Sequence, residues 1–147
     1  MNQNQPIKSV LNLHCVFRRI IERQMADLGL SSIQSRMLGY LQFQADNGKQ
    51  VFQSELEEEF KIRKSSVTSV LQILEKKGLM KRVSVKGDAR RKELLLTAEG
   101  QAMQKQVKDR LDALERQVRD IMTPEEQQML LACVQKIETR LKEAEYD

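Results

Sequence analysis

The sequence predicts a mainly α-helical protein with a small β-hairpin wing, arranged as a winged helix-turn-helix with long terminal helices. Three observations support this fold class. Within residues 51–97, a short amphipathic helix and a second helix are followed directly by two strand-like segments around a basic turn. Helical apolar stripes extend on both sides of this stretch. Signals that begin or end helices separate the stripes from one another.

The second helix of the central stretch has the clearest pattern, and we expect it to span residues 64–77. Its apolar residues recur at i, i+3, i+4 and i+7, which places them on one buried stripe. They are Val67, Val70, Leu71 and Leu74. Gly78 follows, where a left-handed residue commonly ends a helix. The outward face is small and polar at its N-terminal end, as a helix that enters a major groove requires.

The residues after Gly78 predict two strands around a turn at Gly87-Asp88. Between residues 76 and 92, eight side chains are basic and only Asp88 is acidic. The whole chain has a net charge of only +4, so the positive charge is concentrated on this hairpin. A charged turn can simply be solvated. Next to a polar helix face, however, such a concentration of charge favours binding to a nucleic-acid backbone.

The segment DARRKELLLTAEG resembles the wing signature of the MarR (multiple antibiotic resistance regulator) family, in which Asp-x-Arg is followed by Leu-Thr-x-x-Gly. The matching residues are Asp88, Arg90, Leu96, Thr97 and Gly100. The preceding VTSVLQILEKKGLMKR is similar to the recognition helix and first wing strand of that family. The resemblance implies a single MarR-type domain over residues 1–147. Its DNA-binding winged helix-turn-helix would be residues 31–97, and its dimerisation helices would be residues 7–28 and 98–145.

The same resemblance implies a transcriptional regulator that binds double-stranded DNA as a homodimer at a pseudo-palindromic operator. A repressor released by a small-molecule effector is the expected type. The side chains expected in the major groove are Lys64, Ser65, Ser66, Thr68 and Ser69. In the wing, we expect Arg90 and Arg91 to contact DNA and Lys86 to contact a phosphate. Asp88 would hold the wing arginines in place, since phosphate repels a carboxylate.

Capping signals place the helices before the central stretch. An apolar stripe predicts a helix over residues 7–28, and Gly29 ends it. Ser31 and Gln34 have the spacing of a capping box, so a second helix begins there.

The boundaries inside the central stretch are less regular. Val51-Phe52 could form a short strand that pairs with the wing. Ser54 and Glu57 have the spacing of a capping box for the short third helix. The MarR family usually has a Ser-type cap where this chain has Arg63, so the start of the recognition helix could shift to Ser65.

Two long helices are predicted after the wing. Thr97 is a suitable N-cap for the first, in which apolar residues from Met103 to Ile121 recur at steps of three or four, as in a coiled-coil seam. The segment 123–126 has the cap, proline and glutamate that begin another helix, whose apolar stripe covers residues 130–141. Together these stripes exceed what one small winged domain can cover. We therefore expect the terminal helices of two subunits to interdigitate, with a monomeric helical bundle as the alternative.

The composition is that of an ordinary soluble, helix-rich protein, with 31% charged and 40% hydrophobic residues. No apolar run approaches the roughly 18 residues that span a bilayer, and the start lacks the apolar core of a signal peptide. We therefore expect a cytoplasmic protein without a membrane partner. One histidine and two cysteines cannot build a convincing zinc site. No catalytic motif is present, so we expect no enzyme activity and no cofactor.

Three residues are candidates for contact with an effector: His14, Phe17 and Met37. A lone histidine on a helix can also simply pack or face solvent. Cys15 raises the alternative of a thiol-based redox sensor, because one branch of the MarR family senses peroxide through a cysteine in its N-terminal helix. The tyrosine partners of that branch have no evident counterpart here, and we expect Cys133 to lie in the core.

Two alternatives to a DNA-binding regulator remain open. One is a winged-helix protein-interaction module whose basic hairpin binds an acidic partner. Salt dependence separates it from a DNA-binding protein, because counterion release from a polyanion makes affinity fall steeply with salt. The other is a small helical enzyme, which the missing catalytic motifs disfavour.

Overall fold

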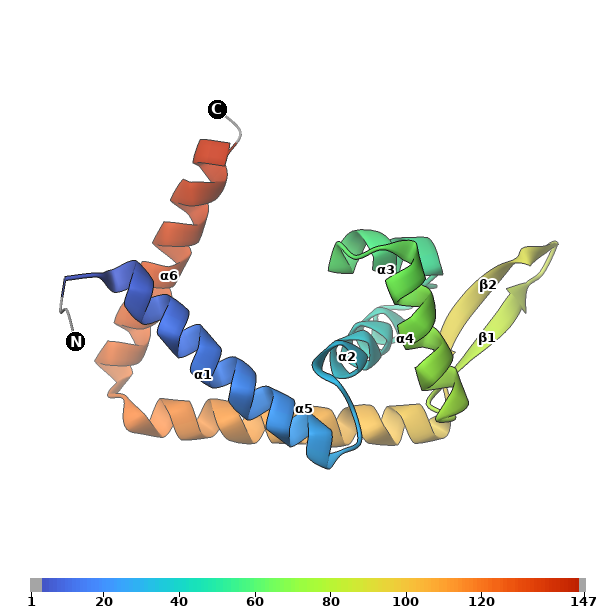
Figure 1. Cartoon of the computed structure of the whole chain (residues 1–147), viewed down its shortest axis with the longest axis horizontal. Helices are drawn as coiled ribbons and strands as arrows, with labels where there is room; N and C mark the ends of the chain where they lie inside the picture. The colour runs from blue at the N-terminus through green and yellow to red at the C-terminus, as the bar shows by residue number, and fades with distance from the viewer. Residues whose placement is uncertain (1–3, 146–147) are drawn as a thin grey trace. The chain divides into compact units, whose positions relative to one another are not determined.

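The computed structural model describes residues 4–145, and this part of the chain forms six helices and one two-stranded antiparallel sheet (Figure 1). The elements are α1 (Pro6–Asp27), α2 (Ser32–Asp46), α3 (Gln53–Phe60), α4 (Lys64–Lys76), β1 (Met80–Val85), β2 (Asp88–Leu96), α5 (Ala98–Ile121) and α6 (Pro124–Glu145). The predicted fold class, mainly helical with a hairpin wing, is therefore confirmed. The chain divides into two compact units, residues 1–110 and residues 111–147, and α5 begins in the first unit and ends in the second.

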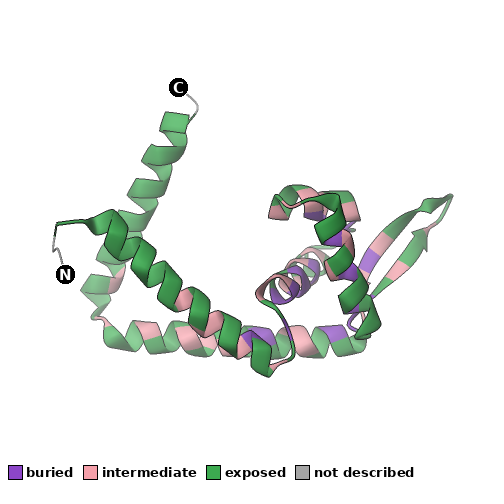
Figure 2. Cartoon of the chain, in the orientation of Figure 1, coloured by how far each residue is buried: buried purple, intermediate pink, exposed green. Residues whose placement is uncertain are grey.

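The core of the first unit is built around α2, α4 and the root of the hairpin (Figure 2). The buried apolar side chains are Met25, Leu30, Met37, Leu38, Leu41, Val51, Leu56, Val67, Leu71, Leu74, Leu79, Met80, Leu94 and Val107. The stripe predicted for α4 is confirmed, with Val67, Leu71 and Leu74 fully buried and Val70 packed beside them. Burial of this stripe leaves the polar face of α4, with Ser65 and Ser69, exposed to solvent.

The start of α2 is fixed by the predicted capping box. The Gln34 backbone N–H donates to Ser31 Oγ at 3.3 Å, and the Ser31 backbone N–H donates to Gln34 Oε1 at 3.1 Å. Gly29 ends the preceding turn with a φ of +74°, a left-handed conformation that glycine adopts without a Cβ clash. Lys77, just after α4, donates from Nζ to the Gly29 carbonyl and, at 3.4 Å, to Gln34 Oε1. The end of α4 is thereby tied to the turn between α1 and α2.

The predicted capping box of α3 is wrong. The helix begins at Gln53, so its N-cap is Phe52, whose backbone N–H donates to Glu55 Oε1 at 3.3 Å. A cap at Ser54 would start the helix later than the structure does. The observed start combines the local bond between Phe52 and Glu55 with a backbone hydrogen bond that ties Val51, the residue before Phe52, to the wing.

The expected strand at residues 51–52 is not formed. The backbone of this segment is joined to the wing by one hydrogen bond, from the Leu94 N–H to the Val51 carbonyl at 2.9 Å. Lys61 ends α3 with a φ of +50°, which is uncommon for a residue with a side chain. The recognition helix α4 then begins at Lys64, and Arg63 before it supplies no side-chain cap.

Thr97 connects the end of α4, the hairpin and the start of α5. Its hydroxyl donates to the Gly78 carbonyl at 2.6 Å and accepts from the Gly100 N–H at 3.0 Å, as predicted for an N-cap. Its backbone N–H donates to the Leu79 carbonyl at 3.2 Å. A Cβ at Gly100 would lie 1.8 Å from the Leu79 carbonyl oxygen. The Leu-Thr-x-x-Gly pattern therefore describes a close contact that only glycine permits.

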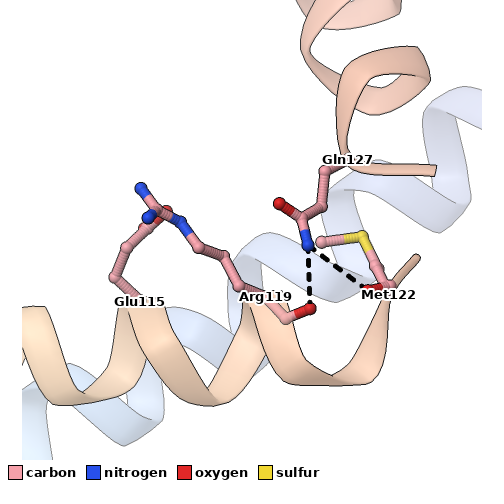
Figure 3. Close-up of polar contacts among 4 residues, drawn as sticks. All are labelled: Glu115, Arg119, Met122 and Gln127. Carbon is pink, nitrogen blue, oxygen red and sulfur yellow. Dashed lines mark hydrogen bonds and ion pairs between the residues drawn. The ribbon is translucent and has the colours of Figure 1, made fainter. Parts of the chain in front are cut away.

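In the second unit, the turn between α5 and α6 is held by hydrogen bonds to backbone groups. The predicted cap is confirmed: the Thr123 N–H donates to Glu126 Oε2 at 2.9 Å, and the Glu126 N–H donates to Thr123 Oγ1 at 3.2 Å. Figure 3 shows the Gln127 amide reaching back to the end of α5. Its Nε2 donates to the Arg119 carbonyl at 3.0 Å and to the Met122 carbonyl at 3.3 Å. These bonds satisfy carbonyls that the end of a helix leaves without partners.

Each unit exposes apolar side chains on its terminal helix. In α1 they are Ile7, Val10, Leu11, Leu13 and Val16, and in α6 they are Met129, Leu130, Leu131, Val134, Ile137 and Leu141. No residue of α6 is buried in the single chain, and Figure 2 shows this helix as almost entirely exposed. The expectation that Cys133 lies in the core is therefore wrong for the single chain, because Cys133 is exposed there.

Candidate nucleic-acid interface

The N-terminal half of α4 exposes a short polar surface. Lys64, Ser65, Ser66 and Ser69 are exposed, and Thr68 is half-buried. Two of the hydroxyls are engaged within the protein: Ser69 Oγ donates to the Ser65 carbonyl at 2.9 Å, and Thr68 Oγ1 accepts from Gln53 Nε2 at 2.7 Å. The first residues of a helix also have backbone N–H groups without intrahelical acceptors, which favour an anion. This end of α4 combines hydroxyls, one cation and a positive helix terminus.

The wing is a hairpin with a two-residue turn at Lys86 and Gly87, where Gly87 has a φ of +92°. Regular pairing extends from Met80 opposite Leu96 to Ser84 opposite Lys92, and the next pair is Val85 with Asp88. Residues 89–91 are therefore extra residues of β2 that the ladder leaves unpaired. Such a bulge turns side chains out of the regular alternation of a strand.

Asp88 stabilises this irregular segment. Its Oδ1 accepts a hydrogen bond from the backbone N–H of Arg90 at 3.0 Å. This is a local turn of the kind that aspartate side chains commonly form. The carboxylate thus fixes the backbone of Arg90, while the exposed guanidinium extends from the bulge.

The two wing arginines have different surroundings. The Arg91 guanidinium lies 3.8 Å from the ring centroid of Phe52, a cation–π contact with the residue that caps α3. Lys86, Arg90 and Arg91 are all exposed, but the Arg91 guanidinium is directed back toward the helices. At the root of the hairpin, Arg82 pairs with Glu75 of α4 at 3.1 Å.

Comparison with known proteins decides the family. Residues 28–91, which include α2, α3, α4 and most of the wing, match the model of the MarR family. The chain is also similar to the structure of a putative MarR family transcriptional regulator from Clostridium acetobutylicum, with 25% identity, a TM-score of 0.70 and coverage of 93% of this chain and 99% of that one. The winged helix-turn-helix region of the chain, residues 28–91, belongs to the MarR family. A MarR-type winged helix-turn-helix makes the chain a DNA-binding transcription regulator.

Two further solved structures share the MarR-family fold of the chain. One is YusO from Bacillus subtilis, with 24% identity, a TM-score of 0.73 and coverage of 95% of this chain and 99% of that one. The other is the complex of Staphylococcus aureus MepR with DNA, with 21% identity, a TM-score of 0.75 and coverage of 91% and 96%. No curated protein sequence matches.

The structure of this MarR-family chain separates the expected effector residues. His14 is exposed on α1, and Phe17 on the same helix is half-buried. Met37 is fully enclosed in the core of the first unit, where its side chain serves packing. Cys15 is exposed on α1. These environments do not define a common pocket for an effector.

The sequence pattern does not indicate two residues of the interface. Gln53 and Phe52 contact Thr68 and Arg91, which belong to distant positions of the chain. The pattern around Phe52 indicates only a strand, and nothing local distinguishes Gln53 from other polar residues at a helix start. Only the packing of α3 between α4 and the wing brings these pairs together.

Among residues 4–145, no group of three or more His, Cys, Asp or Glu side chains could hold a metal ion. Within the same range, no helix has the length and hydropathy needed to cross a membrane.

Proposed function

We propose that the chain represses transcription by binding a pseudo-palindromic operator as a homodimer. In each subunit, α4 would enter a major groove and the wing tip would reach the adjacent minor groove or backbone. The observation that carries this proposal is the placement, in one compact unit, of an exposed polar helix N-terminus beside a strongly basic hairpin.

The chemistry of the exposed groups supports a division of roles. Lys64, Ser65, Ser66, Thr68 and Ser69 supply a cation and short hydroxyls, which suit base edges and phosphates in a major groove. Arg90, beyond the bulge of the wing, has the length and charge to enter a narrow minor groove. The similar MepR chain was solved in complex with DNA, which supports the same mode of binding here.

The apolar faces of the terminal helices support a homodimer. The exposed side chains of α1 and of α6 form continuous stripes that a soluble monomer rarely leaves uncovered. A second copy would cover them through a self-complementary interface. Sedimentation of the free protein at micromolar concentration should therefore show a dimer. A monomer at that concentration would count against the proposal.

Selection of binding sites from random duplex DNA tests the proposed function. We expect the selected sequences to share an imperfect two-fold symmetric motif, because a two-fold dimer presents two identical helices. Affinity for the selected duplex should fall steeply with salt, since each neutralised phosphate releases counterions. A pool without an enriched motif, or an affinity insensitive to salt, would exclude specific DNA binding and favour a protein partner.

The proposed regulator lowers transcription when it is bound to its operator, and an effector releases it from that site. A reporter gene behind the selected operator should be less active when the chain is expressed in the same cells. A compound that releases the operator should shift the chemical shifts of His14 or Phe17, the accessible effector candidates on α1. Increased reporter activity on expression of the chain would contradict a repressor.

A further inference from the structure

A recess of about 260 Å³ lies between the root of the wing and the start of α3. Four basic side chains line it: Arg82, Arg90, Arg91 and Lys92. Gln53 and Ser54, the first two residues of α3, form the opposite wall, and no lining residue carries a carboxylate. Arg82 already pairs with Glu75 at 3.1 Å, whereas Arg90, Arg91 and Lys92 form no ion pair in the described structure. Cations that share one small recess repel one another unless an anion lies between them. The recess therefore has the charge of an anion site.

Side-chain contacts hold the cationic wall in place. The Arg91 guanidinium lies on the ring of Phe52, which is itself only 8% exposed. Lys92 Nζ donates to Ser84 Oγ across the hairpin at 2.5 Å. Because their positions are set before an anion arrives, these cations lose little side-chain freedom when it binds.

The α3 wall adds hydrogen-bond donors. Gln53 and Ser54 are the first two residues of their helix, so their backbone N–H groups have no intrahelical acceptor. The helix dipole places partial positive charge at the same end. Gln53 also donates from its side chain to Thr68 Oγ1 at 2.7 Å, which links this wall directly to α4. The recess and the recognition helix are therefore fixed relative to each other.

We propose that this recess binds one phosphate of the DNA backbone, and that Arg91 contacts this phosphate rather than a base or the minor groove. The proposal rests on the proposed DNA binding and assigns a different role to each wing arginine. Arg90 also lines the recess, but no side-chain contact in the described structure holds its exposed guanidinium there, so it can enter the groove. Arg91, stacked on Phe52, supplies a fixed charge to the recess. Through its bond to Thr68, Gln53 sets the position of α4 relative to the bound phosphate.

Neutral methylphosphonates, placed one at a time along the selected operator, test this proposal. For the wild-type protein, one position in each half-site should weaken binding several-fold when its phosphate is neutral. For Arg91→Ala, the same methylphosphonate should have no further effect, because the cation that senses the charge is absent. The slope of log affinity against log salt should also decrease by about 1 for this variant.

Two further variants, one inside the recess and one outside it, test whether the methylphosphonate effect depends on the recess. Gln53→Glu keeps the shape of the side chain but places a carboxylate in the recess, so it should weaken binding and lose sensitivity at the same methylphosphonate. Lys81→Ala removes one charge from an exposed residue of β1 that does not line the recess. This control should retain the sensitivity of the wild type at that position.

The outcomes separate this proposal from the proposed function. A wild-type protein without specific affinity for any duplex contradicts both. A wild-type protein that binds the operator, but shows no methylphosphonate position coupled to Arg91→Ala, contradicts only the phosphate site. Binding of benzoate at the Arg91 side chain without such coupling would assign the recess to a free organic anion and overturn the proposal.

Discussion

Gly100 is the residue at which the fold tolerates the least change. A methyl group there would lie 1.8 Å from the Leu79 carbonyl oxygen, a backbone atom that cannot move without displacing the hairpin. We expect Gly100→Ala to lower the free energy of unfolding by at least about 2 kcal/mol, because overpacking forces the backbone apart. Chemical denaturation measures the loss.

Gly39, inside α2, provides the matched control for Gly100. The atom nearest to a Cβ at Gly39 is Gln104 Nε2 at 4.0 Å, an ordinary contact. Gly39→Ala should therefore stabilise the protein by about 0.5–1 kcal/mol, since alanine restricts the unfolded helix segment more than glycine does. Equal effects of the two substitutions would show that the contact with Leu79 is not what requires glycine.

Arg90 is the wing residue on which binding should depend most. Its backbone is fixed by Asp88, and its exposed side chain extends from the bulge of β2. We expect Arg90→Ala to weaken operator binding by about 1–3 kcal/mol if the guanidinium reads a groove. Fluorescence anisotropy with a labelled operator measures this loss. Lys105→Ala, which removes an exposed charge from α5, should leave the affinity nearly unchanged, and a folded Arg90→Ala with wild-type affinity would disprove the role.

At the scale of elements, local capping chemistry made most of the fold predictable. Ser31, Thr97 and Thr123 each begin a helix where the sequence indicates, because a cap needs only residues a few positions apart. The start of α3 was not predictable in this way. A capping spacing also fits Ser54, whereas the helix starts two residues earlier, where the Phe52 N–H donates to Glu55 and Val51 is bonded to the wing.

Some features of the candidate interface follow from local sequence, and others depend on contacts between distant residues. The exposed positions of α4 and the basic wing follow from helical periodicity and charge, which adjacent residues determine. The stacking of Arg91 on Phe52 and the bond from Gln53 to Thr68 depend on how α3 packs against α4 and β2. No periodicity or motif encodes such packing, so the sequence predicts the same role for both arginines.

The junction at Thr97 permits a test of how the elements are joined. Its hydroxyl connects the Gly78 carbonyl after α4 with the Gly100 N–H at the start of α5. Thr97→Val keeps the shape of the side chain but removes both hydrogen bonds, which should cost about 1–2 kcal/mol of stability. Thermal or chemical unfolding measures the cost. Thr97→Ser retains the hydroxyl and should lose less than half as much, so equal losses would argue that the methyl group, not the hydroxyl, matters.

The whole molecule, as a dimer, constrains the spacing of its DNA site. Two copies of α4 related by a two-fold axis can enter major grooves on one face of B-DNA only if their centres lie about 34–36 Å, or 10 base pairs, apart. We therefore expect half-sites at that spacing, each flanked by A·T-rich minor groove into which Arg90 can insert. Base discrimination within a half-site should be modest, because the hydroxyls of Ser65 and Ser66 are short and rotate freely.

Insertion of five base pairs at the centre of the operator tests this geometry. The insertion adds about half a helical turn and places the second half-site on the opposite face of the duplex. One dimer can then engage only one half-site, so affinity should fall toward that for non-specific DNA. Insertion of ten base pairs restores the face but not the distance, so it should also bind poorly if the dimer is rigid. If the duplex with five added base pairs binds as tightly as the original, α4 does not enter two grooves as a pair.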